Sequence, residues 1–312
     1  MNPLKSDEIY GNWGTLLLPI NRDDSIDFLR LGEEVDKLIA MQVNGIYSNG
    51  TAGEFYNQTE AEFDKIHQLL AEKCNAAGMP FQIGCSHMSP LISLERVKRA
   101  TSLNPGAIQI ILPDWYTPSL EEISGFLEKI AEAADPAGLI LYNPPHAKRK
   151  LSPEEFGQLR SRIPSLLGCK VMGGDERWYQ AMQQHVPGFS IFVAGHTLAT
   201  GFRWGAHGAY SNVACLHPQA AQRWYEQMKT EFPAALALEK RIQQLMSSYI
   251  SPLILEENYS PQACDKLLAA IGGWANIGMR LRWPYRSIPE DSVGVLREKA
   301  RKLLPEFFPD KE

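Results

Sequence analysis

The sequence predicts an α/β protein built as a (β/α)8 barrel, followed by a small C-terminal helical domain. Short apolar or β-branched runs recur at spacings of roughly 20 to 35 residues, as parallel strands joined by helices require. The stretches between the runs have helical periodicity, and after Pro218 the strand signal disappears. An open doubly wound sheet would show the same local alternation and is the competing fold.

Eight runs are the predicted strands of the barrel. They cover residues 13–20, 45–48, 81–85, 107–112, 138–142, 166–172, 190–194 and 208–213. Helical periodicity is clearest in residues 27–41 and 59–76. Three helix starts carry a hydroxyl followed three residues later by a glutamate, a pair that satisfies orphan amide donors: Thr59 with Glu62, Ser119 with Glu122, and Ser152 with Glu155.

The C-terminal part of the chain is predicted to be helical throughout. Its four helical stretches cover residues 219–231, 234–248, 261–271 and 292–304. The first would be the eighth helix of the barrel, and the others would pack as a bundle. We therefore predict two domains, a barrel over residues 1–232 and a helical domain over residues 233–312.

The composition favours a cytoplasmic protein whose expected partner is a small molecule or another copy of itself. Of the 312 residues, 44% are hydrophobic and 21% are charged, which is ordinary for a globular protein. The net charge of −5 comes without a basic stripe, so nucleic acid is not an expected partner. No apolar stretch approaches the roughly 20 residues of a membrane helix, and the amino terminus carries no export signal.

The five cysteines indicate buried thiols in a reducing compartment. Their number is odd, and they form neither CxxC pairs nor Cys/His metal spacing. The seven histidines likewise show no paired-ligand spacing, so we expect no metal site. Neither a GxGxxG nor a GxxxxGK[ST] motif is present, so the sequence does not predict binding of dinucleotides or nucleoside triphosphates.

The active site of a parallel barrel lies at the carboxyl ends of its strands. Lys170 lies within the otherwise apolar sixth strand, where burial disfavours a charged ammonium and a neutral amine would attack carbonyl groups. Tyr142 lies 28 residues earlier, at the end of strand five, so the two should stand at equivalent heights on adjacent strands. A phenol beside such an amine can both give and take protons. The competing interpretations are a solvent-facing edge lysine and a core tyrosine.

The second strand leads into a glycine-rich turn, Gly50-Thr51-Ala52-Gly53-Glu54. Its backbone amides are of the kind that hold a carboxylate. A tight turn without a ligand is the alternative, since glycine turns at strand ends are common.

Together these motifs resemble the dihydrodipicolinate synthase/N-acetylneuraminate lyase family in order and spacing. The resemblance covers nearly the whole chain, including a tail in which Arg280 and Arg282-Trp283-Pro284 precede a last helix. The motifs that carry it are Gly50-Thr51-Ala52-Gly53-Glu54, Tyr142-Asn143-Pro144-Pro145, Gly168-Cys169-Lys170 with Gly174-Asp175, and Gly208-Ala209-Tyr210-Ser211.

The resemblance implies a homo-oligomer, either a tetramer or a dimer, that uses no metal or organic cofactor. Lys170 would be the Schiff-base lysine and Tyr142 the proton donor and acceptor. Thr51 would relay protons to this tyrosine, and the amides of Thr51 and Ala52 would hold the carboxylate of a 2-oxo acid. Tyr210 falls where a backbone group of strand eight faces that acid.

The sequence departs from the family pattern at three positions. The usual second hydroxyl of the turn is Ala52, Trp115 stands where the synthases have a relay tyrosine unless a one-residue slip brings in Tyr116, and Ala147 replaces an arginine. Lys148 and Arg149 are close enough in sequence to substitute for that arginine, or they belong to a solvated basic turn. We expect the outer pocket to be shaped by Asp114, Trp115, His146 and Ser211.

Three function classes follow for this 2-oxo-acid site. The first is a Schiff-base lyase or aldolase that acts on pyruvate or a related 2-oxo acid, with a sugar acid or an aromatic 2-oxo acid as the larger substrate. The second is a dehydratase of a 2-keto-3-deoxy sugar acid that uses the same imine. The third is a non-catalytic barrel that binds keto acids.

Overall fold

The computed structural model describes residues 2–210 and 212–308, and its eight strands form a closed parallel barrel in sequence order. This confirms the predicted (β/α)8 barrel. The strands are β1 (Gly11–Thr15), β2 (Gly45–Tyr47), β3 (Phe81–Gly84), β4 (Ala107–Ile111), β5 (Gly138–Tyr142), β6 (Leu166–Lys170), β7 (Ser190–Val193) and β8 (Gly208–Tyr210).

Helices follow the strands, and a C-terminal helical region follows the barrel. The helices that alternate with strands are α1 (Phe28–Ala40), α2 (Glu60–Ala77), α3 (Pro90–Thr101), α4 (Leu120–Ala134), α5 (Pro153–Arg162), α6 (Glu176–His185) and α7 (Leu198–Trp204). The later helices are α8 (Asn212–Leu216), α9 (Pro218–Thr230), α10 (Phe232–Leu245), α11 (Ser251–Leu255), α12 (Pro261–Gly272) and α13 (Ser292–Leu303). Short helical turns are η1 (Ser6–Glu8), η2 (Gly195–Thr197), η3 (Met246–Ile250) and η4 (Pro305–Phe307).

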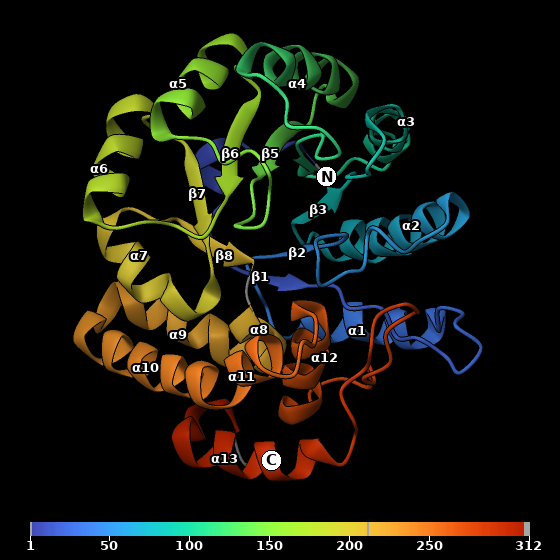
Figure 1. The fold of residues 1–312 in the computed structure, drawn as a ribbon, viewed down its shortest axis with the longest axis vertical. Helices are drawn as coiled ribbons and strands as arrows, with labels where there is room; N and C mark the ends of the chain where they lie inside the picture. Colours follow the sequence, from blue (N-terminus) through green and yellow to red (C-terminus); the bar gives the residue numbers. More distant parts are fainter. Residues whose placement is uncertain (1, 211, 309–312) are drawn as a thin grey trace. The chain divides into compact units, whose positions relative to one another are not determined.

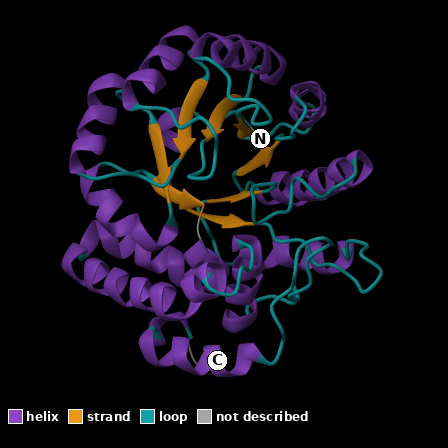
Figure 2. Cartoon of the chain, viewed as in Figure 1, coloured by secondary structure: helices purple, strands orange, loops and turns teal. Residues whose placement is uncertain are grey.

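The chain divides into two compact units that are discontinuous in sequence. The first comprises Met1–Gly11, Gln58–Ala194 and Gly201–Ala209, and the second comprises Asn12–Asn57, Gly195–Thr200 and Tyr210–Glu312. In the first unit, helices α4 to α6 lie outside strands β5 to β7 (Figure 1), and Figure 2 shows these strands in orange inside the purple helices. In the second unit, α8 packs against α9 and α12. The domain boundary at residue 232 stays a prediction.

Local signals placed the helix starts correctly. Thr59, Ser119 and Ser152 each accept a hydrogen bond from the backbone of the glutamate three residues later, whose carboxylate accepts one from the capping residue. The predicted first strand is too long, because the observed strand ends at Thr15. The Leu17 amide donates to Glu34 Oε1 at 2.8 Å. A side chain therefore takes the place of a backbone carbonyl from a neighbouring strand. The eighth strand also ends early, at Tyr210, and α8 begins at Asn212.

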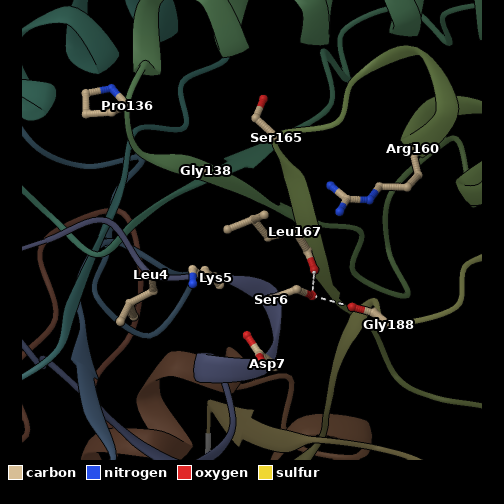
Figure 3. Close-up of a pocket in the computed structure, with 10 residues that line it drawn as sticks. All are labelled: Leu4, Lys5, Ser6, Asp7, Pro136, Gly138, Arg160, Ser165, Leu167 and Gly188. Carbon is tan, nitrogen blue, oxygen red and sulfur yellow. Dashed lines mark hydrogen bonds between the residues drawn. The ribbon is translucent and has the colours of Figure 1, made fainter.

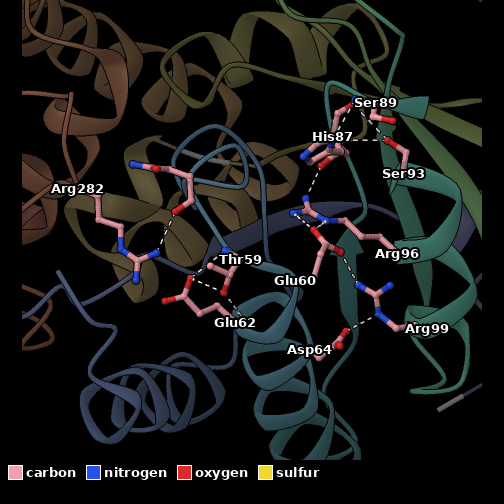
Figure 4. Close-up of polar contacts among 12 residues, drawn as sticks. Thr59, Glu60, Glu62, Asp64, His87, Ser89, Ser93, Arg96, Arg99 and Arg282 are labelled. Atoms are coloured by element: carbon pink, nitrogen blue, oxygen red, sulfur yellow. Dashed lines mark hydrogen bonds and ion pairs between the residues drawn. The ribbon is translucent and has the colours of Figure 1, made fainter. Parts of the chain in front are cut away.

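A polar network around the buried Arg96 joins α2 and α3 to the carboxyl end of β3 in the first unit. Figure 4 shows Glu60 between the guanidinium groups of Arg96 and Arg99, which lie 2.8 and 2.6 Å from its two oxygens. Arg96 Nη1 also donates to the Ser86 carbonyl at 2.6 Å. Because Arg96 is completely buried, this network fixes the backbone that follows β3.

The nearby His67 should make the fold sensitive to acid. Burial, together with the positive charges of Arg96 and Arg99, lowers the pKa of this histidine to about 3. An unfolded chain binds a proton near pH 6.5, so stability is complete above that pH and falls as the pH drops. Between pH 7 and pH 5, His67 should lower the free energy of unfolding of the wild-type protein by about 2 kcal/mol. His67→Gln should not show this part of the loss. Urea titrations of both proteins at the two pH values measure this, and equal losses would contradict it.

Candidate functional site

Lys170 and Tyr142 meet at the carboxyl ends of β6 and β5. The two residues are register partners, and Lys170 Nζ lies 4.2 Å from the centroid of the Tyr142 ring. Both residues are half-buried, so the ammonium is neither sealed in the core nor fully in solvent. The expected placement at equivalent heights on adjacent strands is therefore confirmed.

A shift in strand register produces this pairing. Leu139 pairs with Leu166, but the next residue, Ile140, pairs with Gly168, so β6 carries one extra residue. Without it, Tyr142 would stand opposite Cys169, whose side chain points to the other face of the sheet. Gly168 permits the close approach to β7 here, because an added Cβ would lie 2.4 Å from the Ser190 carbonyl oxygen.

Thiol chemistry does not compete with the amine. All five cysteines are free and buried. Burial raises the pKa of Cys74 and Cys264 to about 12, and it also raises the pKa of Cys169, the neighbour of Lys170. The thiolate form that would act as a nucleophile is thus disfavoured, as the sequence predicts.

The glycine-rich turn after β2 has a defined backbone in the second unit. The amide of Gly53 donates to the Gly50 carbonyl at 3.0 Å, and the amide of Glu54 donates to the Thr51 carbonyl at 3.1 Å. A Cβ at position 50 would meet the Tyr47 ring at 2.6 Å, so any other residue there would require this ring to move. Thr51 is half-buried and Ala52 is buried.

Tyr210 at the end of β8 is a packed aromatic residue. Its ring lies 4.5 Å from that of Tyr47 and 5.8 Å from that of Trp13, measured between centroids. Only 5% of the residue is exposed, so the ring belongs to the packed interior of the second unit. The neighbouring Ser211, predicted to line the outer pocket, lies outside the described residues.

Asp114, Trp115 and the loop after β5 lie together in the first unit. Asp114 Oδ1 accepts a hydrogen bond from the Lys148 amide at 2.9 Å, and Lys148 Nζ donates to the Trp115 carbonyl at 2.8 Å. Trp115 is 81% exposed, and His146, on the loop after β5, is also exposed. Arg149 forms an ion pair with Glu155, so it is already engaged within its own loop and helix.

The match to known proteins decides the family. The model of the dihydrodipicolinate synthetase family matches residues 9–299. The chain belongs to this family. It is 27% identical over 306 residues to a 4-hydroxy-tetrahydrodipicolinate synthase from Methanopyrus kandleri, covering 96% of this chain and 98% of the relative. It is 23% identical to an N-acetylneuraminate lyase from Rhizobium meliloti, covering 95% and 96% of the two chains.

A solved structure of the dihydrodipicolinate synthetase family has the same fold. A prophage protein of that family from E. coli K12, crystallised with pyruvate, superposes with a TM-score of 0.84 at 18% identity, covering 95% of this chain and 98% of that one. The two sequence relatives carry the names of a synthase and a lyase, so the family includes lyases.

A cavity in this dihydrodipicolinate synthetase family member lies away from Lys170. It has a volume of about 520 Å³, and Figure 3 shows its lining. Gly138, Ser165 and Gly188, which line it, lie at or just before the amino ends of β5, β6 and β7. Because Tyr142 and Lys170 end the same strands, this cavity belongs to the opposite end.

Sequence reasoning did not predict several polar contacts of the second unit. His196 follows β7, and its Nδ1 lies 2.9 Å from Asn212 Nδ2. Burial lowers the pKa of His196, which favours the neutral ring. Lys266 of α12 and Glu54 of the glycine-rich turn form a buried ion pair. Only the position of His196 after a predicted strand gave any signal.

Across residues 2–210 and 212–308, no three His, Cys, Asp or Glu side chains are grouped as a metal site would require. Within the same residues, no helix is both long enough and apolar enough to cross a membrane.

Proposed function

We propose that this chain is a Schiff-base-forming lyase or aldolase that acts on pyruvate or a related 2-oxo acid. One observation carries the proposal: the amine of Lys170 and the phenol ring of Tyr142 lie together at two strand ends, with Nζ 4.2 Å from the ring centroid. An amine and a phenol in contact supply a nucleophile for a keto group and a group that exchanges protons. The names of the relatives and the pyruvate-bound family structure support the choice of substrate class.

The proposed reaction begins with attack of neutral Lys170 Nζ on C2 of the keto acid. The carbinolamine loses water, with Tyr142 delivering a proton to the departing hydroxyl, and an iminium ion forms. In the cleavage direction the Tyr142 phenolate takes the proton of the C4 hydroxyl as the C3–C4 bond breaks, its electron pair enters the iminium as an enamine, and an aldehyde leaves. The phenol then returns a proton to C3, and water releases pyruvate and the amine. The positive imine lowers the barrier because it accepts the electron pair.

Other site residues are proposed from the family motifs. The amides of Thr51 and Ala52 hold the carboxylate, Thr51 relays protons to Tyr142, and a Tyr210 backbone group faces the keto acid. Asp114, Trp115, His146 and Ser211 shape the outer part of the site. Oriented binding of the carboxylate fixes C2 near the amine, so little reorganisation remains in the reaction.

We also propose a homo-oligomer located in the cytoplasm. The side chains of Trp115 and Tyr116 are 81% and 85% exposed in a single chain, and burying them against another copy would remove apolar surface from water. The five free cysteines fit a reducing compartment. Sedimentation velocity tests the assembly, and a monomer at micromolar concentration would contradict it.

Borohydride reduction in the presence of 2-oxo acids tests the proposed function. With pyruvate and borohydride together, we expect the intact mass of the wild-type protein to rise by one reduced pyruvate adduct. With borohydride alone or pyruvate alone, the mass should not change. A panel that includes sugar-derived and aromatic 2-oxo acids then ranks the substrates, and the release of pyruvate from the larger acids identifies cleavage. If no member of the panel leaves an adduct, the proposal is wrong.

The missing hydroxyl of the turn gives a gain-of-affinity prediction. Ala52→Ser adds a donor beside the proposed carboxylate position, so half-maximal trapping should need about tenfold less pyruvate, the effect of one hydrogen bond to a charged group. Ala100→Ser, at a buried alanine of α3, is the matched control and should leave this concentration unchanged. An unchanged or higher concentration for Ala52→Ser would argue against the assigned carboxylate position.

A further inference from the structure

A buried ion pair connects the C-terminal helix α12 to the glycine-rich turn, and both partners belong to the second unit. Lys266 Nζ lies 2.7 Å from Glu54 Oε1, with side-chain exposures of 0% and 1%. The same ammonium donates to the Arg280 carbonyl at 2.5 Å. Lys266 therefore binds the last residue of the turn and the tail segment at once.

The ion pair acts on a constrained part of the backbone. Glu54 has a φ of +52°, in the left-handed region that non-glycine residues rarely occupy. Its amide donates to the Thr51 carbonyl, so the position of Glu54 fixes the residues of the turn that lie before it. A strained residue persists only where its surroundings hold it, and here the Lys266 ammonium binds its side chain.

Neighbouring contacts strengthen the same connection. Gln262 lies one helical turn before Lys266, and its Nε2 donates to the Tyr56 hydroxyl at 2.5 Å. Arg282, visible in Figure 4, donates from Nη1 to the Asn57 carbonyl at 3.0 Å. Helix α12 and the tail therefore contact the chain from the last residue of the turn, Glu54, to position 57.

The charges around Lys266 leave Glu54 as its anionic partner. Glu34 is also buried nearby, and its Oε1 accepts the Leu17 amide. Burial raises the pKa of the Glu34 carboxyl well above its usual value, which favours the neutral form. Loss of the Glu54 carboxylate or the Lys266 ammonium would leave the other charge buried and unpaired.

We infer that Lys266 is a positioning residue for keto-acid binding: through Glu54 it holds the Thr51 and Ala52 amides in the orientation that receives the substrate carboxylate. This inference rests on the proposed function. Lys266 does not touch the substrate. It affects substrate binding by orienting the turn. It therefore acts differently from Lys170, which reacts with the substrate.

The test compares pyruvate with pyruvamide, the neutral 2-oxo amide, in borohydride trapping by wild-type protein and Lys266→Met. We expect the pyruvate concentration for half-maximal trapping to rise about tenfold in the variant, while trapping at saturation stays within about threefold of wild type. Half-maximal trapping by pyruvamide should change by less than about twofold, because this ligand lacks the charge that the turn binds.

Two further variants separate positioning from stability. Trp224→Phe loses a buried hydrogen bond to the Ala235 carbonyl between α9 and α10, so it destabilises the same unit without contacting the turn. It should melt at a lower temperature and keep the wild-type pyruvate dependence. If Lys266→Met does not fold, Glu54→Gln/Lys266→Met removes both charges at similar volume and should show the same rise for pyruvate.

The outcomes distinguish the two levels of the proposal. If wild-type protein traps no 2-oxo acid, the proposed function fails and this inference fails with it. If wild-type protein traps pyruvate and the Lys266 variants trap it with an unchanged concentration dependence, only the positioning role is refuted. The positioning role is also refuted if the concentration for half-maximal trapping rises equally for pyruvate and pyruvamide. The ion pair would then have no selective effect on binding of the carboxylate.

Discussion

Replacement of Lys170 by methionine should lower deuterium exchange into the methyl group of pyruvate by about 10⁴-fold or more, the scale expected when a covalent nucleophile is removed. Exchange at this carbon requires an enamine, and the enamine requires the amine at position 170. Proton NMR in deuterium oxide follows the reaction directly. Because no second substrate is involved, the assay does not depend on the identity of the aldehyde.

A second lysine in the chain provides a matched control for this variant. Lys229 Nζ lies 4.5 Å from the centroid of the Tyr225 ring, a cation–aromatic contact like that of Lys170 with Tyr142, but it lies on α9. Lys229→Met should therefore exchange at the wild-type rate. Exchange that persists in folded Lys170→Met, at more than about a hundredth of the wild-type rate, would mean that another group activates pyruvate.

Replacement of Tyr142 by phenylalanine should slow the same exchange by about 10²- to 10⁴-fold, the usual contribution of a positioned general acid–base group. The ring remains beside Lys170, so the contact with the ammonium is kept and only the hydroxyl is lost. Prolonged borohydride treatment should still trap the imine, since the amine is intact. The exchange rate should thus fall much more than the final yield of adduct.

Tyr225→Phe is the corresponding control, because it removes a hydroxyl from the other lysine–tyrosine contact. It should leave both exchange and trapping unchanged. If Tyr142→Phe exchanges protons as fast as wild-type protein, the phenol has no part in proton transfer. The aromatic ring would then serve only to pack against the lysine.

That Tyr142 and Lys170 would lie at the same end of the barrel was predictable from the sequence. Both residues lie at the ends of clear apolar runs, and parallel strands bring such ends to one side. The extra residue of β6 that sets the pairing was not predictable, since no local pattern marks the register shift after Leu139. Helix starts such as Thr59 were predictable because their hydrogen bonds reach only three residues along the chain.

Contacts between distant parts of the chain could not be read from the sequence. Glu54 and Lys266 are 212 residues apart, and nothing in either segment indicates that they pair. The early end of β1 has a similar origin, because the side-chain carbonyl oxygen of the Glu34 carboxyl group accepts the Leu17 amide that would have continued the strand. In both cases a buried side chain from another element decides the local backbone.

The direction of side chains in the outer pocket was also beyond sequence reasoning. Trp115 and His146 were predicted to shape that pocket, and in a single chain both are exposed to solvent. Residues in loops lack the periodicity that tells which face a side chain occupies. Their assignment to the outer pocket therefore stays a proposal.

The most direct measurement of imine chemistry at Lys170 is peptide mapping of the wild-type protein after borohydride reduction with pyruvate. We expect a single modified peptide, with the reduced pyruvate adduct on Lys170 and unmodified Lys148 and Lys266. An adduct on another lysine or on the amino terminus, with Lys170 unmodified, would contradict the assignment of Lys170 as the reacting amine.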